Sequence, residues 1–205
     1  MAIQYTNRAG KTYYLLEGKT KAGKPRYFFA LHQSAKGNAI DAIPEGYEIY
    51  EHPENAQVFL RKKRPRRITD IEEQFVKKHV NSLKRSRRYR VDCKDEYITI
   101  YESNADTDNL KGIFGNVLKT TALRPGVNAD DAVTALINIG DQHYTAVLRF
   151  CLVDKEKRSF TVERFCFQGS IEDWIYLGGP DDLGKVVKKH VKILGTDEFF
   201  DSPYF

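Results

Sequence analysis

Alternation of apolar and polar positions in the first 60 residues predicts a small β module. KTYYLLEG (11–18) and PRYFFAL (25–31) are β-rich runs, and the intervening KTKAGK supplies Gly23 for a turn. GYEIYEH (46–52) and AQVFLRK (56–62) predict a second strand pair around Pro53. We therefore expect four short antiparallel strands, forming a strongly twisted sheet or half-barrel over residues 1–60.

The pattern changes to helical spacing at Thr69. Thr69 and Glu72 have the spacing of a capping box, in which each side chain accepts a hydrogen bond from the other residue's backbone N–H. The helix that follows is predicted to run to about Ser86. Its predicted apolar stripe consists of Ile71, Phe75, Val76, Val80 and Leu83.

Residues 87–101, RRYRVDCKDEYITIY, predict a tight hairpin that turns at Lys94-Asp95. TAVLRFCLV (145–153) and SFTVERFCF (159–167) predict two central strands joined by KEKR. The face of the first hairpin assigned to the core contains Tyr89, Val91, Cys93, Ile98 and Ile100. Between the hairpins, NADDAVTALINIG (128–140) predicts a short helix.

The end of the chain predicts more helix. Residues 170–173 are expected to start a helical turn that holds Trp174, and Gly178-Gly179-Pro180 to interrupt the chain. Pro180 is expected to open a last helix to Leu194. We therefore predict an α+β fold: a small antiparallel β module (1–60), a basic connector (61–68), and an α+β domain with an antiparallel sheet flanked by helices (69–205).

Two arginines stand out in the second predicted hairpin. With KEKR as the turn, Arg149 and Arg164 face each other on an apolar surface, where two like charges repel. Either acidic side chains such as Glu172 or Asp173 neutralise them, or they form an anion pocket. A register shift of one residue would separate the pair.

The three cysteines, Cys93, Cys151 and Cys166, lack the spacing of metal ligands. In the predicted register Cys151 and Cys166 lie four positions apart along the hairpin, about 13 Å, which is too far for a disulfide. We expect three buried free thiols, as in a reducing compartment.

Charge is unevenly distributed along the chain. Residues 1–92 contain 20 lysines and arginines against 10 acidic residues, whereas residues 93–205 contain 13 against 18. RKKRPRR (61–67) has six cations in seven positions, and Pro65 disfavours a helix there. A basic front half predicts a polyanionic partner, although a charge run can also be a solvated linker.

Nucleic acid is the partner that this pattern favours, bound through its phosphates with weak sequence preference. The predicted contacts are Arg61, Lys62, Lys63, Arg64, Arg66, Arg67, Lys77, Lys84, Arg88 and Arg90, with Lys21, Lys24 and Arg26 of the N-terminal hairpin. Tyr97 and Tyr101 are candidates for base stacking.

No motif for a nucleotide loop, a catalytic serine or a zinc protease occurs, so we expect a non-enzymatic protein without cofactor or metal. One alternative is a protein-interaction subunit of a larger complex, with the basic connector binding an acidic partner and the acidic, aromatic tail TDEFFDSPYF (196–205) as a further contact. A weaker one is a metal-dependent nuclease built on Asp92 and Lys94, with Glu72 and Glu73 nearby. No apolar run is long enough for a membrane span or signal peptide, which predicts a cytoplasmic protein.

Three blocks resemble a group of uncharacterised bacterial proteins. They are GKTYYLLEGKTKAGKPRYFF (10–29), IPEGYEIYEHPENAQVFLRK (43–62) and FQGSIEDWIYLGGPDDLGKVVKKHVKILGTDEFF (167–200). The resemblance covers both ends of the chain and implies a bacterial, cytoplasmic setting. The group has no established activity, so it assigns no residue a role.

Overall fold

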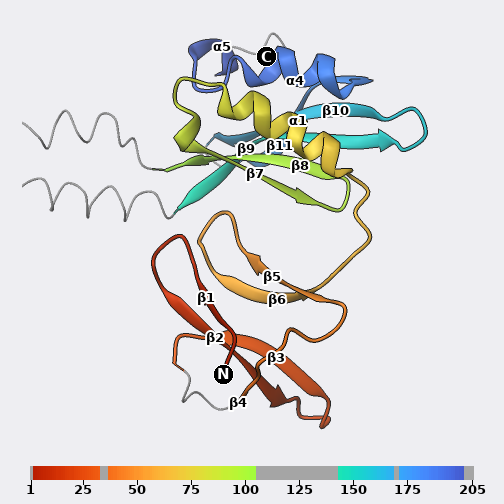
Figure 1. Cartoon of the computed structure of the whole chain (residues 1–205). Coiled ribbons are helices and arrows are strands. Elements are labelled where there is room, and N and C mark those ends of the chain that lie inside the picture. Colours follow the sequence, from red (N-terminus) through yellow and green to blue (C-terminus); the bar gives the residue numbers. More distant parts are fainter. Residues whose placement is uncertain (1, 33–36, 105–142, 169–170, 201–205) are drawn as a thin grey trace, which may run out of the picture. The chain divides into compact units, whose positions relative to one another are not determined.

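The chain folds into two compact units. The computed structural model describes residues 2–32, 37–104, 143–168 and 171–200 (Figure 1). Within these residues, the first unit takes in Met1–Arg64 and the described ends of Asn104–Tyr144, and the second takes in Pro65–Ser103 and Thr145–Phe205. The division between Arg64 and Pro65 falls inside the stretch predicted as a connector. The predicted helix over 128–140 lies outside the described residues, as do Tyr204 and Phe205.

Short antiparallel strands make up the first unit. They are β1 (Gln4–Thr6), β2 (Thr12–Lys19), β3 (Pro25–Ala30), β4 (Asn38–Ala39), β5 (Tyr47–Glu51) and β6 (Val58–Lys62). In one sheet β2 pairs with β1, β3 and β4, while β5 and β6 form a separate hairpin. The four predicted strands are present, and the three-residue β1 and two-residue β4 were too short to leave a periodic signal.

Polar side chains join the β1–β2 turn to the β5–β6 hairpin. Nη1 of Arg8 lies 2.8 Å from Oε1 of Glu51 and donates to the carbonyl of His52 at 3.0 Å. The amide of the buried Asn7 donates to the carbonyl of Ala56 at 2.7 Å. These bonds satisfy buried polar groups in a module that has few fully buried apolar side chains.

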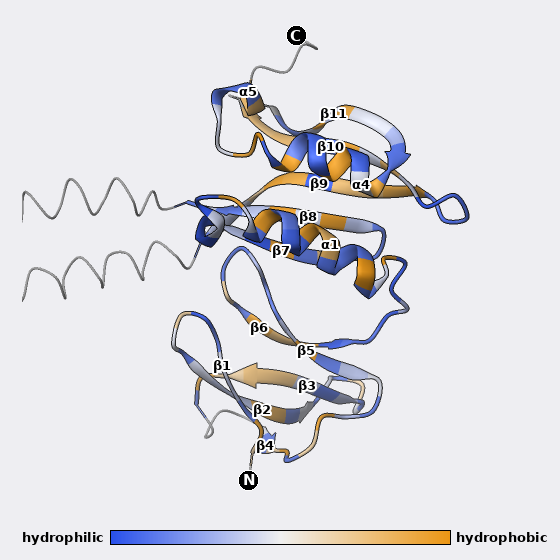
Figure 2. Cartoon of the chain, turned by 45° about the horizontal axis from the view of Figure 1, so that its top comes forward, coloured by the Kyte–Doolittle hydropathy of each residue, from blue (hydrophilic) through white to orange (hydrophobic). Residues whose placement is uncertain are grey.

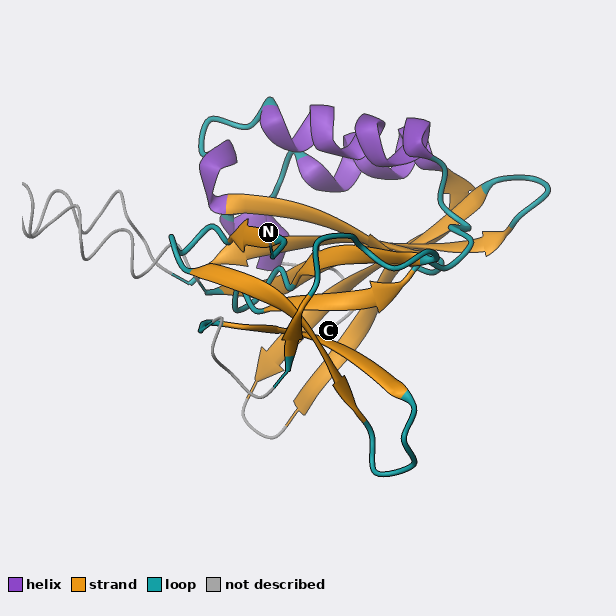
Figure 3. Ribbon diagram, turned by 60° about the horizontal axis from the view of Figure 1, so that its bottom comes forward, coloured by secondary structure: helices purple, strands orange, loops and turns teal. Residues whose placement is uncertain are grey.

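A five-stranded antiparallel sheet with helices on one face forms the second unit (Figure 3). Its helices are α1 (Asp70–Asn81), the short 3-10 helix η1 (Ser86–Arg88), α4 (Leu183–Val191) and α5 (Asp197–Phe200). Its strands are β7 (Tyr89–Lys94), β8 (Tyr97–Ser103), β9 (Tyr144–Asp154), β10 (Ser159–Gln168) and β11 (Ile171–Asp182), in the order β11-β10-β9-β8-β7. The predicted α+β class is confirmed.

The start of α1 confirms the predicted capping box. Oγ1 of Thr69 accepts from the backbone N–H of Glu72 at 3.3 Å, and Oε2 of Glu72 accepts from the N–H of Thr69 at 2.8 Å. The helix ends at Asn81 rather than near Ser86, and the N–H of Ser82 donates to carbonyls of its last turn before the chain continues into η1. Ile71 is 82% exposed. Its predicted burial is wrong because, at 100° per residue, it points about 140° away from the buried Val76.

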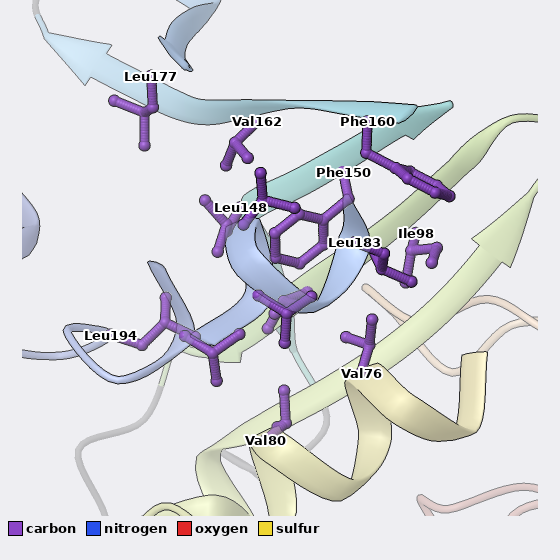
Figure 4. Close-up of a cluster of buried hydrophobic side chains, with 14 of the residues drawn as sticks. Val76, Val80, Ile98, Leu148, Phe150, Phe160, Val162, Leu177, Leu183 and Leu194 are labelled. Carbon is purple, nitrogen blue, oxygen red and sulfur yellow. The ribbon is translucent and has the colours of Figure 1, made fainter. Parts of the chain in front are cut away.

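Both long helices pack their apolar stripes on the sheet (Figure 4). Hydrophobic and hydrophilic residues alternate along α1 and α4, as amphipathic helices require (Figure 2). The core includes Val76 and Val80 of α1, Leu183, Val186, Val187 and Val191 of α4, and Ile98, Leu148, Phe150 and Phe160 of the sheet. The buried positions of α4 have the spacing of one helix face.

In the β7–β8 hairpin the turn lies at Asp95-Glu96, one residue later than predicted. Asp95 has a left-handed φ of 53°. The shift leaves each residue on its predicted face, because it moves the pairing by an even number of positions. Tyr89, Cys93, Ile98 and Ile100 are buried, so the assignment of the core face is confirmed. Val91 packs against the same core while partly exposed.

The predicted pairing of Arg149 with Arg164 is wrong. An irregularity between Ser159 and Phe160 shifts the β9–β10 register by one residue, so that Arg149 lies opposite Glu163. Arg149 forms an ion pair with Glu163. Its acidic partner is therefore a residue of the neighbouring strand rather than Glu172 or Asp173, and it forms no anion pocket with Arg164. Arg164 is buried on the opposite face and donates to the carbonyl of Phe199 in α5. All three cysteines are free, with Cys93 buried and the other two half-buried.

The predicted helical turn at residues 170–173 is also wrong, because this stretch belongs to β11 together with Trp174. Gly178-Gly179-Pro180 continues that strand with irregular pairing. Gly179 has a φ of 104°, and a Cβ there would lie 2.5 Å from the carbonyl oxygen of Phe160. Glycine is therefore required for close contact with β10. The last helix begins at Leu183, and Asp182 caps it by accepting from the N–H of Gly184 at 2.8 Å.

Candidate nucleic-acid interface

The first cations of the basic run extend strand β6. Arg61 and Lys62 are its last two residues. The Nε of Arg61 lies 2.7 Å from Oε1 of Glu48, and its guanidinium lies 3.8 Å from the centre of the Tyr50 ring. Arg61 therefore stabilises the β5–β6 hairpin, while Lys62, Lys63 and Arg64 are exposed.

Later cations of the run are held by acidic residues of the second unit. Nη1 of Arg66 lies 2.7 Å from Oε2 of Glu73, and Lys77 reaches the other oxygen of that carboxylate at 2.6 Å. Burial by itself would raise the pKa of Glu73, but hydrogen bonds and charge from Lys77 and Arg66 outweigh it and lower the pKa below its usual value. Arg67 lies 3.1 Å from Glu96. Arg66, Arg67 and Lys77 therefore already balance charges within the fold.

The N-terminal hairpin presents its cations to solvent. Lys21, Lys24 and Arg26 are exposed around the β2–β3 turn of the first unit. The guanidinium of Arg26 lies 5.8 Å from the centre of the Phe28 ring, at the outer limit of a cation–π contact. This arrangement leaves these charges available for phosphate contacts.

A cleft of about 710 Å³ lies in the second unit, where the C-terminal ends of α1 and α4 meet η1. Its walls carry Lys84, Arg85 and Arg88 from one segment and Lys188 and Lys192 from the other. No acidic side chain lines this cleft within the described residues. We call these five residues the cleft cations.

Three of the cleft cations have side chains without a partner among the described residues. The side chains of Lys84, Lys188 and Lys192 form no hydrogen bond or ion pair with any described residue, and all three residues are exposed. Arg88 differs, because its Nη2 lies 3.0 Å from Oε1 of Glu102. The cleft therefore combines one positioned guanidinium with three lysines that can reorient toward a ligand.

Lysines are common at helix C-termini because they offset the partial negative charge of the last carbonyls. Here turn donors already serve many of these carbonyls. The N–H of Leu83 donates to the carbonyl of Val80 at 3.1 Å, and the N–H of Leu194 to that of Val191 at 3.2 Å. Oγ1 of Thr196 donates to the carbonyl of Ile193 at 2.7 Å. The cleft cations therefore exceed what helix capping requires.

The cleft has an apolar floor, made by Leu83, Val187, Val191 and Leu194. Tyr89 also lines it, and burial together with the Glu102 carboxylate raises the pKa of Tyr89 to about 12. A Cβ at Gly195, whose φ is 73°, would lie 2.6 Å from the Tyr89 hydroxyl. Glycine at this position therefore leaves room for the ring at the edge of the cleft.

The structure brings together only part of the predicted site. Lys84 and Arg88 line the cleft, whereas Arg90 is exposed on β7 opposite Tyr101. Sequence reasoning did not predict Arg85, Lys188 and Lys192 as site residues. The i,i+4 spacing of Lys188 and Lys192 in KVVKKHVK was the available signal, because residues so spaced lie on one helix face.

Two acidic residues of the nuclease alternative, Glu72 and Glu73, form ion pairs with other residues. Arg158 donates to both carboxylate oxygens of Glu72, and Glu73 is shared by Arg66 and Lys77. In the part of the chain that the structure describes, no three His, Cys, Asp or Glu side chains are grouped to hold a metal ion.

No protein-family model, curated protein or solved structure matches this chain. The resemblance to bacterial proteins therefore remains a prediction. Among the described residues, no helix is both long and apolar enough to cross a membrane.

Proposed function

We propose that this protein binds nucleic acid through phosphate contacts with weak sequence preference, and that the cleft cations make the principal contacts. The observation that supports this most directly is the convergence of Lys84, Lys188 and Lys192, unpaired with any described residue, on a cleft without acidic lining. Positive charge gathered in a concave site attracts a polyanion more strongly than the same charge spread over a surface.

Phosphate contacts also explain why no base-reading pattern is needed. Each neutralised phosphate releases condensed counterions, so affinity depends on the number of cations rather than on base sequence. Lys62 and Lys63, with Lys21, Lys24 and Arg26, are exposed cations of the first unit that we propose as secondary contacts. Arg61, Arg66, Arg67 and Lys77 have intramolecular partners, and we assign them a smaller share.

The test is the binding of fluorescent single-stranded DNA, duplex DNA and RNA across a salt series. We expect log Kd to rise linearly with log salt, with a slope of several ions. Replacing Lys84, Lys188 and Lys192 with alanine should weaken binding at least tenfold near 100 mM salt and reduce the slope by about 2 to 3.

Lys189→Ala is the matched control, because Lys189 is an exposed lysine of the same helix and does not line the cleft. It should change affinity by less than about twofold. Equal affinities of the triple variant and the unmodified protein would exclude the cleft as the site. A lack of binding to all three nucleic acids at low salt would exclude the function.

A protein-interaction role is the second candidate. Phe167 and Phe200 are 72% and 65% exposed, and large exposed aromatic side chains favour contacts with other proteins. Failure of every nucleic acid to bind would make this role the preferred one.

A further inference from the structure

We propose that the cleft is a receptor for a terminal phosphomonoester, so that the nucleic acid is bound at a phosphorylated end. This inference rests on the proposed function and adds a substrate class to it. It is drawn from the concave shape of the cleft, the placement of its cations on two walls, and its apolar floor.

The charge of the cleft fits a monoester better than an internal diester. A terminal phosphate carries about −1.5 to −2 charges at neutral pH and has three free oxygens, whereas an internal phosphodiester carries one charge. Lys84 and Arg88 approach from the α1–η1 side, and Lys188 and Lys192 from α4. Cations on two sides can contact several oxygens of one phosphate, and the gain is greatest for the group with the highest charge density.

The shape of the cleft also favours an end. Its volume of about 710 Å³ lies within the range of about 300–1,000 Å³ typical of small-molecule sites. A site of this size can accommodate a terminal nucleotide.

The apolar floor of the cleft provides a second contact for a terminal nucleotide. Leu83 is only partly buried and offers an apolar surface beside the cations, whereas Val187, Val191 and Tyr89 are almost fully covered. A terminal nucleoside can lay its base or sugar against this surface while its phosphate contacts the lysines. Free inorganic phosphate lacks this second contact and should bind more weakly than a nucleoside monophosphate.

The experiment compares one 12-nucleotide single strand of fixed sequence in five forms: with a 5′-phosphate, a 3′-phosphate, free hydroxyls at both ends, a 5′-methyl phosphate, and closed into a circle. We expect at least one phosphorylated form to bind tenfold or more tightly than the hydroxyl form. The methyl phosphate has nearly the same size but only one charge, so it should lose most of the advantage. The circle should bind like the hydroxyl form.

Two lysine variants then test whether the cleft causes the preference for phosphorylated ends. The alanine variant of Lys84, Lys188 and Lys192 should bind phosphorylated and hydroxyl ends equally, while Lys189→Ala should keep the preference. Because all these lysines are exposed, circular dichroism should show unchanged folding. Adenosine monophosphate should compete with the phosphorylated strand, and phosphate at equal concentration should compete less.

The outcomes separate this inference from the proposed function. Equal, salt-dependent binding of all five forms would overturn the phosphomonoester receptor and leave nucleic-acid binding intact. A preference for phosphorylated ends that survives in the triple variant would place the receptor elsewhere and overturn the assignment to the cleft. Failure of all five forms to bind would overturn both.

Discussion

His190 is buried on α4 and only 6% exposed, and its Nδ1 has no hydrogen-bond partner among the described residues. Burial, with a smaller effect from the charge of Lys189, lowers the pKa of this imidazole to about 4. The folded protein therefore holds His190 neutral at pH values where an unfolded chain would protonate it.

The stability of the second unit should consequently depend on pH through His190. The unfolded histidine has a pKa near 6.5, so stability is fully present above that value and falls as pH decreases from about 6.5 to 4. The loss should reach up to about 3 kcal/mol at the lower end. Urea unfolding at several pH values measures it, and in His190→Leu the decline over this interval should be much smaller. An equal decline in both proteins would show that other groups cause it.

At the scale of single elements, α1 combines features that the sequence predicted with one that it did not. The capping box of Thr69 and Glu72 was predictable because it depends on residues three positions apart. The burial of Glu73 between Arg66 and Lys77 was not, because it requires the preceding loop to fold back on the helix. An acidic residue in a first helical turn normally indicates only a favourable helix dipole.

We expect Glu73→Gln to destabilise the second unit by about 1 to 2 kcal/mol, because the amide leaves Arg66 and Lys77 without their shared carboxylate. Urea unfolding at pH 7 measures the change. Asp70→Asn is the matched control, since Asp70 pairs with the same Arg66 at 3.2 Å but its side chain is 88% exposed. Its effect should stay below about 0.5 kcal/mol, and equal effects of the two substitutions would contradict the role given to burial.

The strands show which structural features the local sequence pattern predicted and which it did not. The faces of β7 and β8 followed from alternation, because a small shift in the turn preserved them. The irregularity after Ser159 placed Arg149 on the sheet face opposite to that of Arg164, and nothing in KEKR or its flanks marks it. Likewise, Gly178-Gly179-Pro180 resembles a chain break, yet it continues β11 because Gly179 fits closely against Phe160. Such features depend on the neighbouring strand.

For the whole molecule, the cleft could not be predicted because its walls come from segments about 100 residues apart. Lys84 follows α1 and Lys188 belongs to α4, and only the packing of both helices on one sheet face brings them together. RKKRPRR was the more obvious basic feature in the sequence. In the folded chain several of its cations have acidic partners, so local charge density was a poor guide to the charge available to a ligand.

This difference predicts that two pairs of substitutions in RKKRPRR affect different properties, namely thermal stability for one pair and nucleic-acid binding for the other. Arg66→Ala with Arg67→Ala should lower the melting temperature by a few degrees, because both residues form ion pairs in the second unit. Lys62→Ala with Lys63→Ala should leave the melting temperature unchanged and weaken nucleic-acid binding, by less than the cleft triple variant does. Thermal unfolding and the salt series together test this, and a larger loss of affinity from the Lys62 and Lys63 pair would make the connector the main contact.

The strand order of the second unit has a consequence for the newly made chain. β8 ends at Ser103, whereas its neighbour β9 begins only at Tyr144, about 40 residues later. At a synthesis rate of about 5–20 residues per second, a ribosome delivers β9 several seconds after β8. During that interval β8 is an open edge bearing Ile98 and Ile100, the type of strand that pairs with other nascent chains. Ile98 and Ile100, which are fully buried in the folded protein, therefore lie on a strand that is prone to aggregation during synthesis.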